Sequence, residues 1–185
     1  MDLSGEYRIA AALPDVWRGL NDPEVLARCI DGCRSMQKVG DDQFQAVVKA
    51  KVGPVTATFQ ALLAMTDVQP LAGYVINADI KGGAAGFGKG AATVRLAEAA
   101  GATLLSYEVK ASVGGKLAQV GSRLIDATAR KMADHFFLEF GREVSGAEPE
   151  ATGATLERTR YQPSHQLWIW LVVFAILALV MVLVY

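Results

Sequence analysis

The sequence is poor in the residues that most often form cross-links or carry chemistry. Its 185 residues include only two cysteines and two histidines, and 18 basic groups nearly balance 19 acidic ones. Two cysteines are too few for a disulfide framework, and a net charge of -1 gives no electrostatic basis for binding nucleic acid. Because 52% of the residues are hydrophobic, the chain is also too apolar to be disordered.

Catalytic patterns are equally scarce. His135 lies beside Asp134 in a predicted helix and His165 lies near the C-terminus, and neither belongs to a Ser-His-Asp arrangement. The C-x-x-x-C spacing of Cys29 and Cys33 has no second ligand pair for zinc, so we expect reduced thiols and no metal site. A cyclase or hydrolase would need a buried acid or base that the pattern does not provide. We therefore expect that the protein is not an enzyme.

The C-terminus carries an uninterrupted apolar run, LWIWLVVFAILALVMVLVY, over 167–185. Nineteen helical residues rise about 28 Å, close to the roughly 30 Å of bilayer hydrocarbon. Trp168, Trp170 and Tyr185 stand where such a helix would cross the two interfaces. The run predicts one transmembrane anchor over 167–185.

The residues before this run predict its orientation. Arg158 and Arg160 precede it, and no basic residue follows it, so the preceding domain is expected on the cytoplasmic side of the cytoplasmic (inner) membrane. The N-terminus has an early acid and no sustained apolar region, unlike a signal peptide. Residues 145–166 are rich in Gly, Ala, Pro, Glu and Thr and predict a flexible linker with a reach of about 25 Å. The folded domain is then 1–144.

Within 1–144, most segments alternate apolar and polar residues with period two. A strand-like segment at 3–12 is followed by short helical stretches at 14–20 and 22–30, the second capped by Asp22. The alternating runs then cover 43–52, 55–66, 74–81 and 105–113. This repetition predicts an antiparallel sheet with one solvated face.

The period changes after Gly114-Gly115. Apolar residues from 116 to 144 recur at helical spacing with almost no breakers, which predicts one long amphipathic helix that covers the apolar face of the sheet. The expected fold is α+β: a helix-grip domain in which a curved antiparallel sheet wraps around a long C-terminal helix, followed by one transmembrane helix.

Small side chains are frequent on the inward-facing positions of this sheet. They leave volume between sheet and helix, which favours a ligand cavity, but alanines also permit close helix packing. Both interpretations stay open at this point. The alanines concerned are Ala46, Ala50, Ala57, Ala61, Ala78 and Ala111.

A glycine-rich stretch, GGAAGFGKG, occupies 82–90. It lacks the G-K-[ST] step of a phosphate-binding loop, and strands rather than a helix follow it. A flexible hairpin connection is the simpler interpretation. A mobile loop in which Phe87 and Lys89 gate a cavity or contact a partner is the alternative.

Four segments resemble the carbon monoxide dehydrogenase G-subunit family, which belongs to the START/Bet v 1-like (SRPBCC) superfamily of helix-grip domains. The resemblance covers roughly 1–144, and Asp31 stands where family members usually carry proline. The matching segments are VWRGLNDPEVLARCIDG at 16–32, KVGPV at 51–55, KGGAAGFGKGAA at 81–92 and VGGKLAQVGSRLIDATARKMADHFFLEF at 113–140.

The resemblance implies an accessory protein of a molybdenum hydroxylase such as carbon monoxide dehydrogenase. Such a protein would recruit the enzyme to the membrane and help electrons reach the quinone pool. The superfamily's habit of holding lipophilic ligands implies a bound respiratory quinone, menaquinone or ubiquinone, between sheet and helix. A solidly packed domain that only anchors the enzyme is the alternative.

The strand and helix faces provide the candidate ligand-binding residues. Tyr74 and Tyr107 are the inward polar groups that would meet quinone carbonyls, or they would satisfy one another at the edge of the core. Trp17 and Phe87 are candidates for the mouth, and Thr128 is a further polar candidate. The apolar lining is expected from Phe59, Leu63, Ile76, Leu117, Val120 and Leu124.

Overall fold

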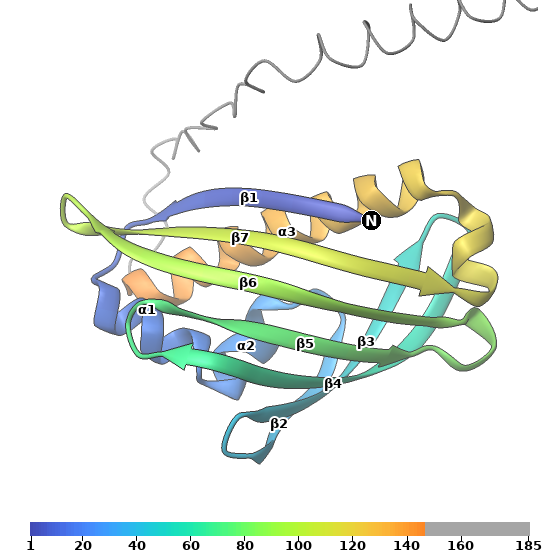
Figure 1. Ribbon diagram of the computed structural model, residues 1–185, viewed down its shortest axis with the longest axis horizontal. Helices are drawn as coiled ribbons and strands as arrows, with labels where there is room; N and C mark the ends of the chain where they lie inside the picture. The colour runs from blue at the N-terminus through green and yellow to red at the C-terminus, as the bar shows by residue number, and fades with distance from the viewer. Residues whose placement is uncertain (147–185) are drawn as a thin grey trace, which may run out of the picture.

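A single seven-stranded antiparallel sheet, with helices across one of its faces, dominates the computed structural model, which describes residues 1–146 (Figure 1). The strands lie in the order β1-β7-β6-β5-β4-β3-β2, so the first strand pairs with the last and the chain otherwise forms a meander. The strands are β1 (Asp2–Ile9), β2 (Cys33–Gly40), β3 (Gln43–Val52), β4 (Val55–Gln69), β5 (Gly73–Lys81), β6 (Phe87–Ala99) and β7 (Ala102–Gly114). The helices are α1 (Leu13–Leu20), α2 (Pro23–Cys29) and α3 (Ser122–Ser145), with 3-10 turns η1 (Gly83–Ala85) and η2 (Gly115–Val120).

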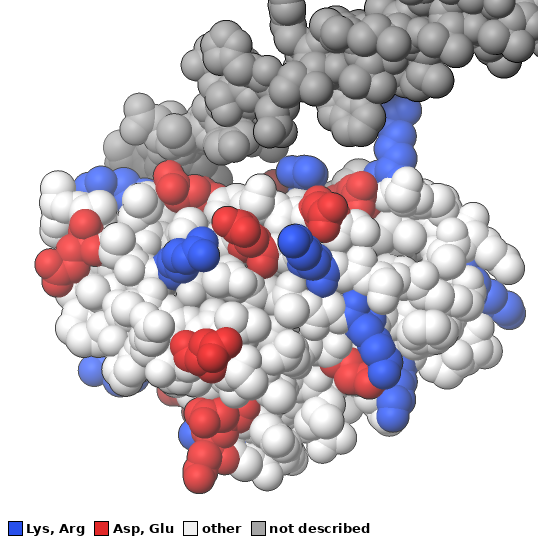
Figure 2. Space-filling model, in the orientation of Figure 1, with Lys and Arg blue, Asp and Glu red and all other residues white. Residues whose placement is uncertain are grey.

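Side chains along the strands point alternately to the core and to solvent, as the period-two pattern predicts. Phe44, Phe59 and Met65 are buried, whereas the intervening Gln45 and Gln60 are exposed. One face therefore forms the core and the other meets solvent. On the face of the domain seen in Figure 2, acidic and basic side chains are interspersed rather than gathered by sign.

The two short helices form where the sequence places them. Pro14 lies in the first turn of α1, where its missing N–H costs nothing. The Asp22 side chain caps α2 by accepting hydrogen bonds from the backbone N–H groups of Glu24 (2.8 Å) and Val25 (3.4 Å). The prediction of Asp22 as an N-cap is confirmed.

The long helix begins later than predicted. Residues 116–120 belong to η2, which buries Leu117, and the α-helix starts only at Ser122. Gly121 separates the two segments with φ +93°, a conformation that a helix does not contain and that glycine adopts without strain. The prediction of one continuous helix from residue 116 is therefore wrong over its first part, whereas α3 runs one residue beyond the expected end at 144.

Two further segments differ from the prediction. The edge strand β2 pairs only with β3, and its four polar residues do not alternate regularly with the others, so the period-two pattern did not reveal it. The glycine-rich stretch is a loop only over 82–86, closed by a hydrogen bond from Gly82 N to Gly86 O (2.8 Å). From Phe87 onward it is strand β6, paired with both β5 and β7, so a mobile loop through 87–90 is wrong.

No helix within residues 1–146 is long and apolar enough to cross a bilayer. The predicted anchor at 167–185 and nearly all of the predicted linker at 145–166 lie outside the described residues.

Candidate functional site

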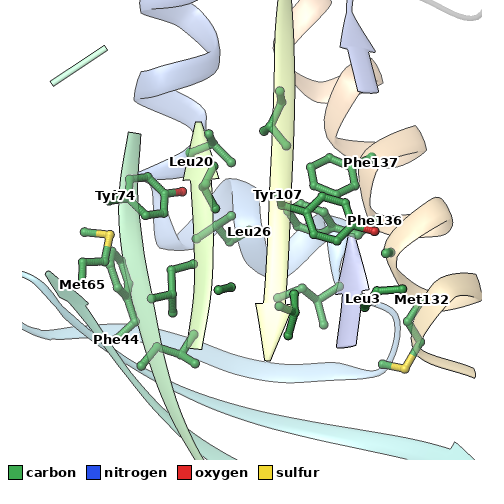
Figure 3. A pocket seen from close by; sticks show the side chains of 18 of the residues that line it. Leu3, Leu20, Leu26, Phe44, Met65, Tyr74, Tyr107, Met132, Phe136 and Phe137 are labelled. Atoms are coloured by element: carbon green, nitrogen blue, oxygen red, sulfur yellow. The ribbon is translucent and has the colours of Figure 1, made fainter. Parts of the chain in front are cut away.

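The inner face of the sheet is divided into a hollow part and a filled part. The hollow part is a cavity of about 380 Å³ enclosed by the sheet, α1, α2 and α3 (Figure 3). Of its 20 lining residues, only Asp31, Tyr74 and Tyr107 have polar side-chain atoms. The cavity exceeds the lower limit of roughly 300 Å³ for small-molecule sites, and its apolar wall suits an apolar guest.

The filled part lies at the other end of the same strands. Phe59, Ala85 and Leu117 are buried there and form a second cluster with side chains such as Val55 and Val113. Leu117 enters this cluster from η2, because the 3-10 turn follows directly on β7 and folds back over the sheet. The cavity therefore cannot continue along the full length of the strands.

Of the two open interpretations, the cavity applies at one end of the sheet, but the small side chains proposed as its cause are not the ones that line it. None of the six inward alanines lines the cavity, and Ala50 and Ala57 instead pack against the filled cluster. Small residues permit close packing there. The volume arises where α1, α2 and α3 bridge the sheet, and mostly large side chains line it, with Ala92 and Ala133 as the small ones.

Tyr74 provides a polar group on the inner wall, and its hydroxyl has no hydrogen-bond partner within the described domain. Its side chain lies on β5 with 5% exposure, and its hydroxyl points toward the side of Leu20 (Figure 3). No hydrogen bond to this hydroxyl is present among residues 1–146, and burial alone raises the pKa of Tyr74. Because this hydroxyl faces the cavity and is not engaged by another protein group, it is available to donate a hydrogen bond to a ligand.

Tyr107 has a different environment although it lies on the same face. Strand register places Val94 between it and Tyr74, so the two tyrosines cannot satisfy one another. The Tyr107 ring lies over Gly5, whose missing side chain makes room: a Cβ there would stand 2.7 Å from the Tyr107 hydroxyl. The hydroxyl is thus directed to the β1 side, and mainly burial raises the pKa of Tyr107.

A stack of aromatic rings closes the cavity on the β1 side. The Phe137 ring of α3 lies 5.6 Å from the Tyr107 ring and 4.2 Å from the Tyr7 ring, measured between centroids. The Tyr7 hydroxyl donates a hydrogen bond to the Asp134 carboxylate (2.7 Å). This bond joins β1 to α3 and fixes the wall that Tyr107 lines.

The exposed lining residues indicate where the cavity meets solvent. Asp31 and Met132 are the only two, and they lie on the α2–β2 turn and on α3, so we place the mouth between these elements. The turn is closed by a hydrogen bond from Cys33 N to Ile30 O (3.1 Å). Its third residue, Gly32, has φ +72° and lies so close to the β3 backbone that a Cβ would overlap the carbonyl of Lys49. Asp31 is therefore held at the mouth by a rigid corner.

The structure brings together four of the predicted site residues. Leu63 and Ile76, together with Tyr74 and Tyr107, line the cavity. Trp17 does not line it but packs edge-on against the Tyr74 ring, with 5.8 Å between centroids, and so supports the wall from behind.

The other six predicted residues lie elsewhere. Phe59 and Leu117 belong to the filled cluster. Val120 and Leu124 lie against the β3–β4 turn, where a Cβ at Gly53 would meet both of them. Phe87 is 49% exposed beside Gly114, and the Thr128 hydroxyl donates to the backbone carbonyl of Leu124 (2.8 Å).

Sequence reasoning missed the part of the wall that α2 and β2 provide. The spacing of Leu26 and Ile30 by one helical turn is a signal of an apolar face, but a helix as short as α2 does not indicate what that face contacts. Met36 lies on the strand that no pattern revealed. The position of Asp31 at the mouth follows from this missing strand.

Comparisons with solved structures show which fold this is. A conserved protein from Geobacillus kaustophilus has a TM-score of 0.74 and 28% identity, covering 79% of this chain and 96% of its own. A START superfamily protein from Mycobacterium smegmatis has a TM-score of 0.60 and 13% identity, covering 78% and 97%. Ara h 8.0201 has a TM-score of 0.58 and 13% identity, covering 80% and 99%. The fold is START-like, as the resemblance implied.

Sequence comparison identifies the family. No curated protein matches this chain. The family model for the G subunit of carbon monoxide dehydrogenase (CoxG) matches residues 5–145, which include nearly all of the described domain. The chain therefore belongs to the CoxG family, named for the G subunit of carbon monoxide dehydrogenase.

Proposed function

We propose that this protein is a membrane-anchored accessory protein that holds a respiratory quinone, menaquinone or ubiquinone, in its cavity. It recruits a molybdenum-containing dehydrogenase of the carbon monoxide dehydrogenase type to the cytoplasmic membrane, where electrons pass to the quinone pool. The observation that carries the ligand part is the unpartnered Tyr74 hydroxyl inside an apolar cavity of about 380 Å³. The protein itself performs no catalysis in this proposal.

The cavity suits a lipophilic molecule on energetic grounds. Each CH₂ group buried from water contributes about 0.8 kcal/mol, and the lining offers no buried charge that such a group would have to desolvate. The volume lies near the lower end of the range for small-molecule sites. It admits a ring system and the start of an isoprenoid chain, and the rest of a long chain must leave by the mouth.

The chain's own residues give the ring a defined orientation. Tyr74 donates a hydrogen bond to a ring carbonyl, and the aromatic faces of Tyr107 and Phe137 bound the opposite side. Bound quinone supplies an acceptor for electrons and protons. The isoprenoid tail passes between Asp31 and Met132, the exposed residues of the mouth.

The membrane and enzyme parts of the proposal have other support. The anchor rests on the apolar run at 167–185 and on the arginines that precede it. The molybdenum enzyme as partner rests on the family to which the chain belongs.

The experiment compares two neighbouring leucines of β4. Leu63 lines the cavity, whereas Leu62 is 48% exposed on the opposite face. The full chain is purified from membranes of a quinone-producing host, extracted with organic solvent, and its quinone is quantified per protein by mass spectrometry. Leu63→Trp fills the cavity and is expected to lower the quinone content at least about tenfold. Leu62→Trp is the matched control and is expected to leave it unchanged.

Two outcomes would contradict the proposal. Equal quinone in wild type and Leu63→Trp would place the ligand elsewhere. The absence of quinone or other lipid from every preparation would favour a ligand-free scaffold that only anchors the dehydrogenase.

A further inference from the structure

The residues that line the cavity carry charge of one sign only, which bears on the choice of ligand. Of the 20 residues that line the cavity, Asp31 is the only charged one, and none is lysine, arginine or histidine. Asp31 forms no ion pair within residues 1–146. Arg28, a basic residue of the preceding helix α2, is instead paired with Glu143 (2.9 Å). The basic residues nearest to the mouth in sequence do not line the cavity: Arg34 follows Asp31, and Arg130 and Lys131 precede Met132.

We infer that Asp31 is a specificity-determining residue that selects uncharged lipophilic ligands and rejects anionic amphiphiles such as fatty acids. This inference rests on the proposed function, because it concerns what enters the same cavity. It narrows the ligand class by charge, which neither the fold nor the family fixes.

A fatty acid meets an unfavourable environment in either orientation. With its carboxylate inward, the charge is buried near Tyr74 without a cation to compensate it, which is strongly unfavourable. With its chain inward, the carboxylate lies at the mouth beside the negative charge of Asp31. A neutral ligand avoids both penalties and still accepts the hydrogen bond from Tyr74.

The position of Asp31 makes this repulsion difficult to relieve. The turn that carries it is closed at both ends, by the hydrogen bond between Cys33 N and Ile30 O and by a hydrogen bond from Lys49 N to Gly32 O (2.9 Å). Since Gly32 also packs directly on the β3 backbone, the corner cannot move away from an entering anion without breaking its link to the sheet.

The experiment measures displacement of a neutral fluorophore, N-phenyl-1-naphthylamine, from the full chain in phosphatidylcholine nanodiscs, with empty nanodiscs subtracted. Decanol and decanoate compete at pH 8 as ligands of equal chain length. In wild type, decanol is expected to compete at concentrations at least about tenfold lower than decanoate. Asp31→Asn should reduce this ratio about threefold to tenfold by removing the like charge at the mouth. Asp41→Asn, which makes the same charge change at the other end of β2, should leave it unchanged.

The outcomes separate the inference from the function on which it rests. Equal competition by both ligands in wild type, or a ratio that Asp31→Asn leaves unchanged, would overturn the role of Asp31 while the cavity remains a lipid site. If the fluorophore does not bind, or if neither ligand displaces it, both the proposed function and the inference fall.

Discussion

The two ends of the sheet's inner face differ although the same strands build both. β4 contributes Leu63 and Met65 to the cavity and Phe59 to the filled cluster, and β7 likewise contributes Tyr107 to one and Val113 to the other. The difference lies in what covers the strands. At the filled end, Leu117 of η2 packs directly on the sheet. At the hollow end, α1, α2 and α3 cover the sheet and leave the cavity beneath them. The position of the helices that cover the sheet, rather than the residue types on its strands, thus decides where the cavity forms.

The largest expected effect comes from truncating a large side chain in each region. Phe59→Ala should lower the free energy of unfolding by about 3–5 kcal/mol, because it opens a new void in a packed cluster. Leu63→Ala should lower it by about 2 kcal/mol, because Leu63 already borders empty volume. Chemical denaturation of the full chain measures both. Equal losses would mean that the two regions are packed alike.

A smaller effect is expected at alkaline pH. Burial disfavours the phenolate and so raises the pKa of Tyr74 above the value of about 10 that it takes in the unfolded chain; the folded protein therefore holds this proton more tightly. Below pH 10 both states keep this proton and no pH dependence arises from it. Above pH 10 the unfolded state loses the proton first, and stability falls by up to about 1.4 kcal/mol per pH unit.

Tyr74→Phe removes this contribution, so wild type should lose stability faster than the variant between pH 10 and 11 in denaturation midpoints. Other groups titrate equally in both proteins and cancel in the difference. Parallel pH curves would show that the hydroxyl is solvated in the folded protein.

The smallest effect is expected from the same substitution at neutral pH. Because no protein group accepts from the Tyr74 hydroxyl within the described domain, Tyr74→Phe should change the free energy of unfolding by less than about 0.5 kcal/mol. Loss of the hydrogen bond to the ligand should nevertheless weaken quinone binding about fivefold, measured by titration of a short-chain quinone. A large loss of stability would instead reveal a structural role for the hydroxyl.

The architecture could be predicted from the sequence because local patterns determine where strands and helices form. Alternation in strands such as β3 and β4, the cap at Asp22 and the helical spacing in α3 each act within a few residues. The same patterns placed Leu63, Tyr74, Ile76 and Tyr107 on the inner face, and all four line the cavity.

The boundary between the hollow and filled regions could not be predicted in this way. Val120 and Leu124 continue the apolar helical spacing, yet the change of direction at Gly121 moves both to the β3–β4 turn. Phe59 and Leu63 share one face of β4, and only the course of η2 and α3 decides which of them meets empty space. Asp31 had no pattern that marked it, because its place at the mouth depends on an edge strand without alternation.

The attachment of α3 has a consequence for the range of guests that the domain can accept. Its C-terminal half is held by α1 and α2: Phe140 is completely buried, Gly19 approaches Val144, and Arg28 pairs with Glu143. Its first half is less enclosed, with Leu124 43% and Met132 39% exposed, and it follows a glycine pivot at Gly121. The part of α3 that borders the cavity mouth is therefore the part that α1 and α2 do not hold. We expect a bulkier guest to be accommodated by displacement of this first half, with the strand pairing of the sheet unchanged.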